Sequence, residues 1–424
     1  MDLNKKKPTR TSCNFSRVMS CLMVLMICFW VVAMYSTSVA LSPISPANDH
    51  QIVPAVAATR SDGNNSSIQA QAPAEKQKPT SSSSSSSSWC DTVAKARSDL
   101  DPALHIQVPC EDMSPAKSAI VVYITAGVEE GKGSKTVFTA VDYVNGVLAL
   151  GASLKDNLTR KDTHMILLLR QGFTLPQEYL DQIKAVGWII GKAPPVDIPK
   201  QYLPSFERYK SVYTKISVTG LSEYDCVLLM DADTLAVGNI DDLMSCVVLH
   251  DGQEPEFRAA GVLDLYRGKW HHFNTGSTLW NTDSAEMNRV YKLTTDPEFM
   301  RKFESDQIFT NTVYPYRIND KINERLMRGE KVDRSDLGLI AHLPFAYNAQ
   351  THLEFQRPEF WDEQHDDIKI IHYTQKKGWQ CPETYSAPDP VPMSARKCNH
   401  KTDANCACRE GYRWYQYLKK AKTY

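Results

Sequence analysis

Short apolar runs alternate with stretches of helical periodicity along the middle of the chain. Runs of apolar, β-branched and aromatic residues predict buried strands at Ala119–Thr125, Met165–Leu169, Trp188–Ile190 and Cys226–Met230. Apolar residues at helical spacing predict helices at Tyr143–Leu154 and Phe206–Val218. This alternation is typical of an α/β domain with a largely parallel sheet, in which ligands bind beyond the carboxyl ends of the strands.

The N-terminal part has a different pattern. Residues Val18–Leu41 carry no charge, and a helix from Val18 to Ala40 would be about 34 Å long, enough to cross a bilayer core. Basic residues crowd the segment before it, whereas the next charged residue after it is Asp49. This asymmetry predicts a cytosolic tail at 1–17, a transmembrane signal-anchor at 18–41 and a lumenal remainder.

A cleaved signal peptide is the other reading of the same segment, because Ser38–Ala40 resembles a small-residue cleavage site. The length of the apolar run favours the anchor. Residues 42–116 follow as a stem rich in Ser, Pro, Ala and Gln, which predicts disorder in a segment unable to bury a core. Asn64, Asn65 and Asn157 lie in glycosylation sequons, in keeping with a lumenal location.

Charge and cysteine content narrow the possible functions. The chain has 424 residues and a net charge of −1, so no basic excess points to a nucleic-acid partner. Of its 11 cysteines, several lie in a Cys-rich extension at 381–424. Cys398 and His400 with Cys406 and Cys408 could form a zinc cluster, but disulfides suit the spacing and an oxidising lumen better.

Two aspartates, Asp231 and Asp233, directly follow the apolar run Cys226–Met230. Two carboxylates at the end of one strand can converge on a single divalent cation, and oxygen ligands suit Mg²⁺ or Mn²⁺. Such an ion stabilises the charge on a nucleotide diphosphate as it leaves. The alternative is that both residues only form a turn or cap a helix, but the buried strand before them and Asn239–Leu243 after them favour the metal site.

Three further polar clusters could contribute to the same site. His271–Gly276 contains Asn274, whose amide can donate to and accept from sugar hydroxyls. Ser305–Gln307 opens a predicted helix, which its first residues could simply cap. Lys369–His372 is a predicted strand that ends in a histidine, and the Lys376–Lys377 pair beyond it would suit a phosphate.

Taken in order, these clusters resemble the motifs of the glycogenin-like family-8 glycosyltransferases. The resemblance runs from about Ala119 to Trp379 and rests on motifs that occur in the same order as in the family. They are Tyr143–Leu154, Tyr213–Lys215, Asp231–Leu235 with Asn239–Leu243, Phe273–Gly276, Asp306–Gln307 with Asn311–Thr312, His342–Asn348 and Ile371–Tyr373.

The resemblance implies a GT-A fold at 117–380, a UDP-sugar donor, Mn²⁺ (or Mg²⁺) and transfer with retention of configuration. By position, Asp231, Asp233 and His372 match the metal ligands, Thr125 and Tyr143 the uridine site, Lys215 and Lys377 the phosphate contacts, and Asn274, Asp306 and Gln307 the sugar contacts. Two departures are an insertion at Gly127–Lys135 and a shortened segment after His372.

The expected protein is thus a Golgi or ER type II membrane enzyme that transfers sugar to a glycan, glycolipid or polysaccharide. Its expected fold class is α/β, a Rossmann-type, mostly parallel sheet flanked by helices. A catalytically inactive glycan-binding relative is the non-enzyme alternative, although both aspartates, His372 and Asp306 are present. A haloacid-dehalogenase-type phosphatase would use Asp231 as nucleophile, but its motif has another spacing.

Overall fold

The computed structural model describes residues 88–424 except 112, 126–138, 205–210, 251, 253–255, 267–268, 302, 304, 315–319, 329, 334–336, 375 and 384–407. The predicted tail, membrane span and most of the stem lie outside the described residues. Within the described part, no helix has the length and apolar character needed to span a membrane.

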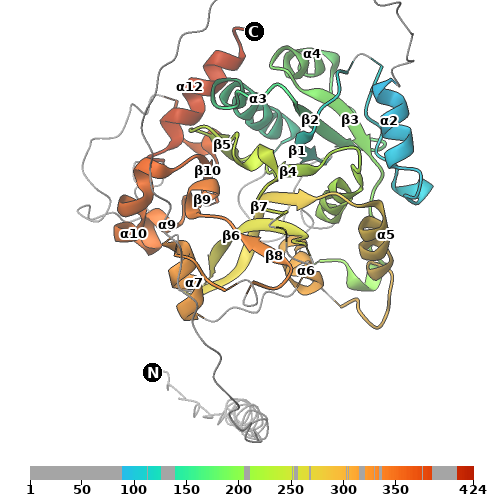
Figure 1. The fold of residues 1–424 in the computed structure, drawn as a ribbon. Helices are drawn as coiled ribbons and strands as arrows, with labels where there is room; N and C mark the ends of the chain where they lie inside the picture. The colour runs from blue at the N-terminus through green and yellow to red at the C-terminus, as the bar shows by residue number, and fades with distance from the viewer. Residues whose placement is uncertain are drawn as a thin grey trace, which may run out of the picture. The chain divides into compact units, whose positions relative to one another are not determined.

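A seven-stranded sheet forms the centre of this part (Figure 1). Every strand runs in the same direction except β7, which is antiparallel to both of its neighbours. The prediction of a mixed α/β fold with a mostly parallel sheet is therefore confirmed. In spatial order the strands are β3 (Ile189–Ala193), β2 (Thr163–Arg170), β1 (Ser118–Ile124), β4 (Cys226–Met230), β7 (Lys269–Asn281), β6 (Ala259–Tyr266) and β8 (Ile340–His342).

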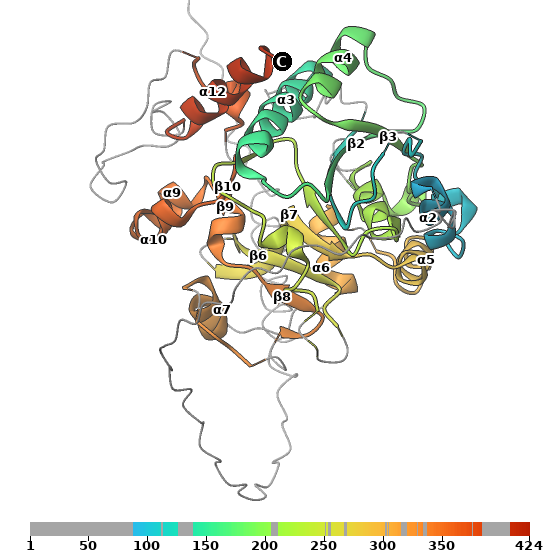
Figure 2. The ribbon, with the colours of Figure 1, turned by 45° about the horizontal axis from the view of Figure 1, so that its top comes forward.

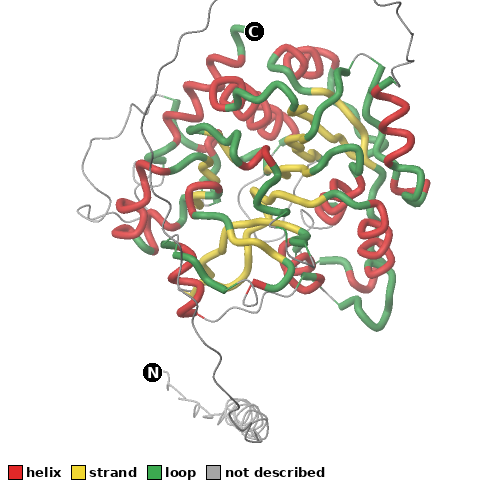
Figure 3. The backbone as a smooth tube through the Cα atoms, viewed as in Figure 1, coloured by secondary structure: helices red, strands yellow, loops and turns green. Residues whose placement is uncertain are grey.

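Alternate residues of β1 enter two hydrophobic cores, one on each face of the sheet. Ile120 and Val122 lie in the core that helix α3 covers, whereas Val121 and Tyr123 lie in the opposite core. Helices cover both faces (Figures 2 and 3). They are α2 (Trp89–Ala96), α3 (Ala140–Asn157), α4 (Gln177–Ala185), α5 (Ser284–Leu293), α6 (Asp306–Val313), α7 (Asp320–Met327), α9 (Leu353–Gln356), α10 (Pro358–Gln364) and α12 (Gly411–Ala421).

Shorter 3-10 turns connect these elements. The helix expected at Phe206–Val218 is a 3-10 helix, η4 (Val212–Gly220), in the part of that range that is described. The others are η1 (Pro102–Leu104), η2 (Lys200–Tyr202), η5 (Leu243–Ser245), η6 (Phe345–Tyr347), η7 (His365–Asp367) and η8 (Gly378–Gln380).

A small second sheet lies beyond the end of β4. Its strands are β5 (Thr234–Ala236), β10 (Ile370–His372) and β9 (Ala349–Gln350), with β10 in the middle. The register pairs His372 with Thr234, the residue after Asp233. This small sheet therefore brings His372 to the aspartate pair, although the two are far apart in sequence.

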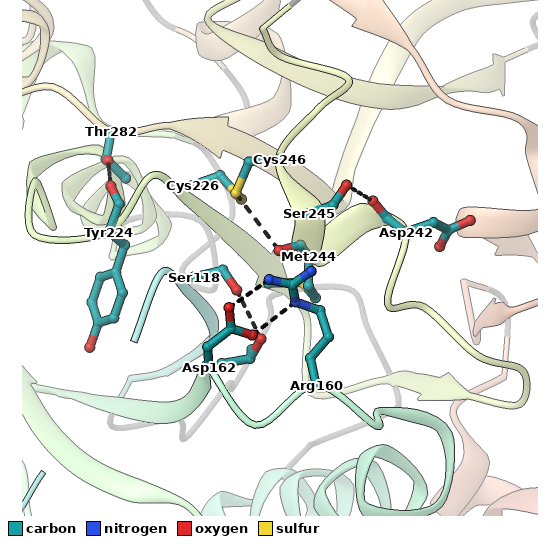
Figure 4. The surroundings of a disulfide bond; sticks show 11 residues. Ser118, Arg160, Asp162, Tyr224, Cys226, Asp242, Met244, Ser245, Cys246 and Thr282 are labelled. Atoms are coloured by element: carbon teal, nitrogen blue, oxygen red, sulfur yellow. Dashed lines mark hydrogen bonds and ion pairs between the residues drawn. A yellow bond between two sulfur atoms is a disulfide. The ribbon is translucent and has the colours of Figure 1, made fainter. Parts of the chain in front are cut away.

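A disulfide closes the segment that carries the aspartates. Cys226, the first residue of β4, bonds to Cys246 just after η5, and both are buried (Figure 4). The closed loop contains Asp231 and Asp233. A crosslink over a loop of this length typically stabilises a fold by about 3 kcal/mol, because it restricts the unfolded chain.

Residues 88–116, which the sequence assigned to the stem, pack on the domain. Trp89, Leu100 and Leu104 are buried in the same core as Val121. Cys90 bonds to Cys110, and Arg97 forms a buried ion pair with Glu223. The described domain therefore includes this segment from residue 88 onward. Scattered buried apolar residues and a disulfide hold the segment in place, although its sequence has no long periodic pattern.

The C-terminal segment also belongs to this unit. Helix α12 packs against α3, and Trp414 of α12 is almost fully buried. Cys408 bonds to Cys381, so a disulfide, and not a zinc cluster, uses this cysteine. Cys398, His400 and Cys406 lie outside the described residues.

Candidate active site

Three potential metal ligands meet beyond the end of β4. Ligand atoms of Asp231, Asp233 and His372 all lie within 4.8 Å of one another. Asp231 and Asp233 occupy the turn between β4 and β5, and His372 ends β10. Two carboxylates and an imidazole are ligands that suit Mn²⁺. The carboxylate oxygens also suit Mg²⁺. The three residues that the sequence predicts as metal ligands therefore lie together in the structure.

Two lysines contact the aspartates of this site. Lys215 Nζ lies 2.6 Å from Asp231 Oδ1, and Lys377 forms an ion pair with Asp233. Burial lowers the pKa of Lys215, but the Asp231 and Asp306 carboxylates outweigh it and raise the pKa well above its ordinary value. Burial likewise raises the pKa of Asp233, yet Lys377 and His372 hold it well below its usual range. Asp233 is therefore ionised and Lys215 charged at neutral pH.

A chain of amide side chains leads from Asp264 on β6 to His372. A carboxylate can only accept hydrogen bonds, so Asn274 Nδ2 donates to Asp264 Oδ2, at 3.3 Å. The Asn274 oxygen therefore faces the other way and accepts from Asn348 Nδ2 at 3.1 Å. The Asn348 oxygen in turn lies 3.0 Å from His372 Nδ1.

This chain orients the ring of His372. Because the Asn348 oxygen can only accept, Nδ1 of His372 carries a proton, and Nε2 is the ring nitrogen that a metal could bind. Nε2 is the atom that faces Asp233, at 3.5 Å from Oδ1. A metal-binding histidine needs this arrangement, with one ring nitrogen donating to a neighbour and the other available for the metal.

Gly276 on β7 is required by the position of this imidazole. A Cβ built on Gly276 would lie 2.1 Å from His372 Cε1, far inside van der Waals contact. Glycine at this position allows another group to come close to the backbone. The group that does so is the ring of His372, and the amide of Asp231 also donates to the Gly276 carbonyl at 2.8 Å.

Asp306 and Gln307 approach the site from the start of α6. Ser305 caps this helix, as predicted, through a bond from the Ile308 amide. Asp306 Oδ2 lies 3.6 Å from Lys215 Nζ and accepts from Thr275 Oγ1 at 3.1 Å. Gln307 Nε2 donates to Asp264 Oδ2 at 2.8 Å. Lys215 therefore contacts both a metal-site carboxylate and the buried carboxylate of Asp306.

Tyr143 and Thr125, the two residues assigned to the uridine site, lie on or just after elements that neighbour β4 or the aspartate turn. Tyr143 contacts Trp379 edge to face, with ring centroids 5.7 Å apart. Its helix approaches the aspartate turn so closely that a Cβ on Gly146 would lie 2.2 Å from the Ala232 carbonyl oxygen. Thr125 follows β1, the neighbour of β4, and is half-buried.

Sequence reasoning gave no role to Asp264 or Asn348. Asp264 interrupts an apolar strand as its one charged residue, a signal that stands out once the strand is known. Asn348 belongs to the motif His342–Asn348, to which the sequence assigns no role. The structure also shows that Lys377, the residue chosen over Lys376, contacts Asp233.

Comparison with curated proteins gives three informative relatives. An inositol phosphorylceramide glucuronosyltransferase of Arabidopsis thaliana is 26% identical over 246 residues, 56% of this chain and 40% of the relative. Galactinol synthase 7 of Arabidopsis thaliana is 25% identical over 34% of this chain and 39% of the relative. Glycogenin-1 of Oryctolagus cuniculus is 24% identical over 58% of this chain and 64% of the relative.

The chain thus spans less than two-thirds of the length of each of these relatives. No family model matches the chain. Among solved structures, the glycosyltransferase GlyE of Streptococcus pneumoniae has a TM-score of 0.40 at 16% identity, covering 73% of this chain and 64% of that one.

The fold and site define a class of protein first: an α/β protein with a strand-end group of two aspartates and a histidine that could hold a divalent cation. The relatives then give the family. They are glycosyltransferases and include glycogenin, so the resemblance predicted from the motifs is confirmed. The chain is a homologue of the glycogenin-like family-8 glycosyltransferases.

The amide chain generates a prediction about metal affinity. Asn348→Leu keeps the branched arrangement of side-chain heavy atoms but removes both the acceptor for His372 Nδ1 and the donor to Asn274. We expect Mn²⁺ affinity to fall about 10–100-fold, as is typical when the hydrogen-bond partner of a metal ligand is lost. Titration of Mn²⁺ followed by electron paramagnetic resonance of the free ion measures this.

Asn311→Leu is the matched control. Asn311 is also a buried amide and bonds to the backbone of Phe273 on β7, but it contacts no residue of the metal triad. Both substitutions should lower the thermal midpoint, and only Asn348→Leu should weaken Mn²⁺ binding. Equal Mn²⁺ affinity in the two variants would show that the amide chain does not orient His372.

Proposed function

We propose that the chain is a GT-A glycosyltransferase that uses Mn²⁺ (or Mg²⁺) to transfer sugar from a UDP-sugar, with retention of configuration. The observation that carries this proposal is the meeting of Asp231, Asp233 and His372 beyond β4. The glycosyltransferase relatives support the reaction class. The retained configuration rests on the family resemblance.

The residues present fit the proposed cation. Asp231, Asp233 and His372 would hold it, and when bound it would stabilise the charge that develops on the leaving diphosphate. Asp231 is the most open of the three, with a quarter of its side chain exposed, so the diphosphate would approach from its side. Lys215 and Lys377, which contact the carboxylates, would bind phosphate oxygens there.

Asp306 is our candidate for stabilising the reacting sugar. Its carboxylate is buried beside Lys215, and Thr275 and the start of α6 fix its position. A fixed negative charge stabilises a sugar carbon that becomes positive, and it does so most effectively where water is excluded. Asn274 and Gln307, both bonded to Asp264, would bind the hydroxyls of the transferred sugar.

The donor and acceptor are proposed only as classes. UDP-glucose, UDP-galactose, UDP-N-acetylglucosamine, UDP-glucuronic acid and UDP-xylose are the donors to compare. The names of the relatives include a glucuronosyltransferase acting on inositol phosphorylceramide and a galactinol synthase. We propose a glycan, glycolipid or polysaccharide acceptor.

Turnover and binding should separate the roles of two aspartates. With Mn²⁺, the purified full-length chain should release UDP from one donor of the panel; EDTA should stop this and Mn²⁺ restore it. Asp306→Asn should lower kcat about 10²-fold or more, the usual cost of losing one preorganised stabilising group, and keep UDP–Mn²⁺ binding. Asp231→Asn should lose that binding.

Asp181→Asn, an exposed change on α4, is the control and should leave both measurements unchanged. Calorimetry of UDP–Mn²⁺ binding accompanies the turnover assay. A chain that releases no UDP from any donor would instead support the inactive glycan-binding alternative. Loss of UDP binding in Asp306→Asn would show that the two aspartates share one role.

We also propose a single-pass type II topology in the Golgi or ER membrane, anchored by 18–41, with the catalytic domain in the lumen. Three disulfides in the described part support an oxidising compartment. The sequons at Asn64 and Asn65 agree with it. Asn157 adds less support, because its amide donates inside the fold to the Ser153 and Ala236 carbonyls.

Protease protection tests this topology. In sealed microsomes the C-terminal half should resist added protease, because the membrane encloses it, and it should be digested once detergent opens the vesicles. Immunoblotting with an antibody against a C-terminal peptide reads out the fragment. Digestion of the C-terminal half in intact vesicles contradicts the topology.

A further inference from the structure

A hollow that includes no residue of the metal triad lies between α7 and α10. It has a volume of about 220 Å³, roughly that of seven water molecules at about 30 Å³ each. Trp270 of β7 and Phe360 of α10 form its apolar wall, with ring centroids 5.7 Å apart. Figures 1 and 2 both show α7 and α10 on the side where the β6–β7 hairpin ends.

Charged side chains of both signs surround this wall. Glu324 comes from α7 and Arg328 directly follows that helix, Glu359 and Glu363 come from α10, and Arg357 precedes α10. Within the described residues, no hydrogen bond or ion pair joins these five side chains to one another. Opposite charges thus gather around one hollow without neutralising each other, which leaves their donors and acceptors available.

The composition of the lining selects the class of ligand. Two arginines against three glutamates leave a net charge of −1, so a phosphate would meet excess negative charge. A compact cation would face two guanidinium groups. A neutral sugar has hydroxyls that donate to carboxylates and accept from guanidinium groups, and its C–H faces pack on aromatic rings. Ligand sites typically combine such apolar walls with a few polar groups.

The hollow is connected to the candidate active site through β7. Trp270 lies in β7, the strand that also carries Asn274 and Gly276. At about 3.4 Å per residue, Trp270 and Asn274 are at most about 14 Å apart along the strand, whose pairing with β6 shifts register between them. An extended saccharide chain could therefore occupy both places at once.

We propose that this hollow is a binding subsite for a neutral saccharide unit of the acceptor, remote from the unit that reacts. The assignment to the acceptor rests on the proposed glycosyltransferase function. It narrows the acceptor to one with at least two linked sugars, because the subsite and the reacting sugar lie in different places. A lipid or small alcohol without a glycan chain would leave the subsite unused.

Saturation-transfer NMR of the full-length chain tests the subsite without a donor. The probes are lactose, cellotriose, maltotriose and mannotriose, in a detergent that has no sugar headgroup. At least one probe should receive saturation from the wild-type chain. Arg328→Leu should weaken it at least about tenfold, because a hydrogen bond to a charged group contributes about 1.5 kcal/mol or more.

Arg325→Leu, three residues before Arg328, is the matched control, because Arg325 pairs with Glu330 and does not line the hollow. It should leave saccharide binding unchanged. Saturation of no probe, or equal binding by both leucine variants, would overturn the proposal. Loss of the saccharide signal when inorganic phosphate is added at a lower concentration than the saccharide would also overturn it.

UDP release to water separates this proposal from the proposed function. Arg328→Leu should release UDP from the donor as fast as the wild-type chain, because Arg328 lies outside the metal site. If UDP is released but no saccharide binds, the subsite is wrong and the reaction stands. If saccharides bind in an Arg328-dependent way but no donor is consumed, the subsite stands and the reaction is wrong.

Discussion

The repulsion among three carboxylates is the constraint around which this site is built. Asp231, Asp233 and Asp306 converge on one partly buried region, where like charges repel more strongly than in water. Lys215 lies between Asp231 and Asp306, and Lys377 contacts Asp233. These two ammonium groups offset the repulsion among the carboxylates. A divalent cation on the same carboxylates would offset it more strongly. Cation binding would therefore release the two lysines, which could then bind phosphate.

The fold supplies the rigidity that such a charge cluster requires. Asp231 and Asp233 follow a buried strand whose first residue is crosslinked to Cys246. His372 comes from a separate small sheet, and its ring is held between the amide of Asn348 and the bare backbone of Gly276. Each of these contacts restricts the movement by which the repelling carboxylates would otherwise separate. The site is therefore positioned by elements that lie far apart in sequence.

Many of the strands and site residues could be predicted from the local pattern of apolar and polar residues. The strand Cys226–Met230 has the predicted bounds, because five consecutive buried residues bordered by aspartates leave little choice. The role of Asp264 could not be predicted, since it depends on β6 lying beside β7 and on amides that only the fold brings into line. Residues 88–116 were assigned to the stem because their buried residues are scattered, and only the tertiary core reveals what they contact.

Diffraction at the manganese absorption edge from crystals grown with Mn²⁺ and UDP would show whether Asp231, Asp233 and His372 hold the cation. We expect one anomalous peak about 2.0–2.2 Å from carboxylate oxygens of Asp231 and Asp233 and from His372 Nε2. We also expect Lys215 and Lys377 to turn from the carboxylates toward the diphosphate. A peak elsewhere, no peak at all, or lysines still paired with both aspartates beside a bound UDP would contradict this expectation.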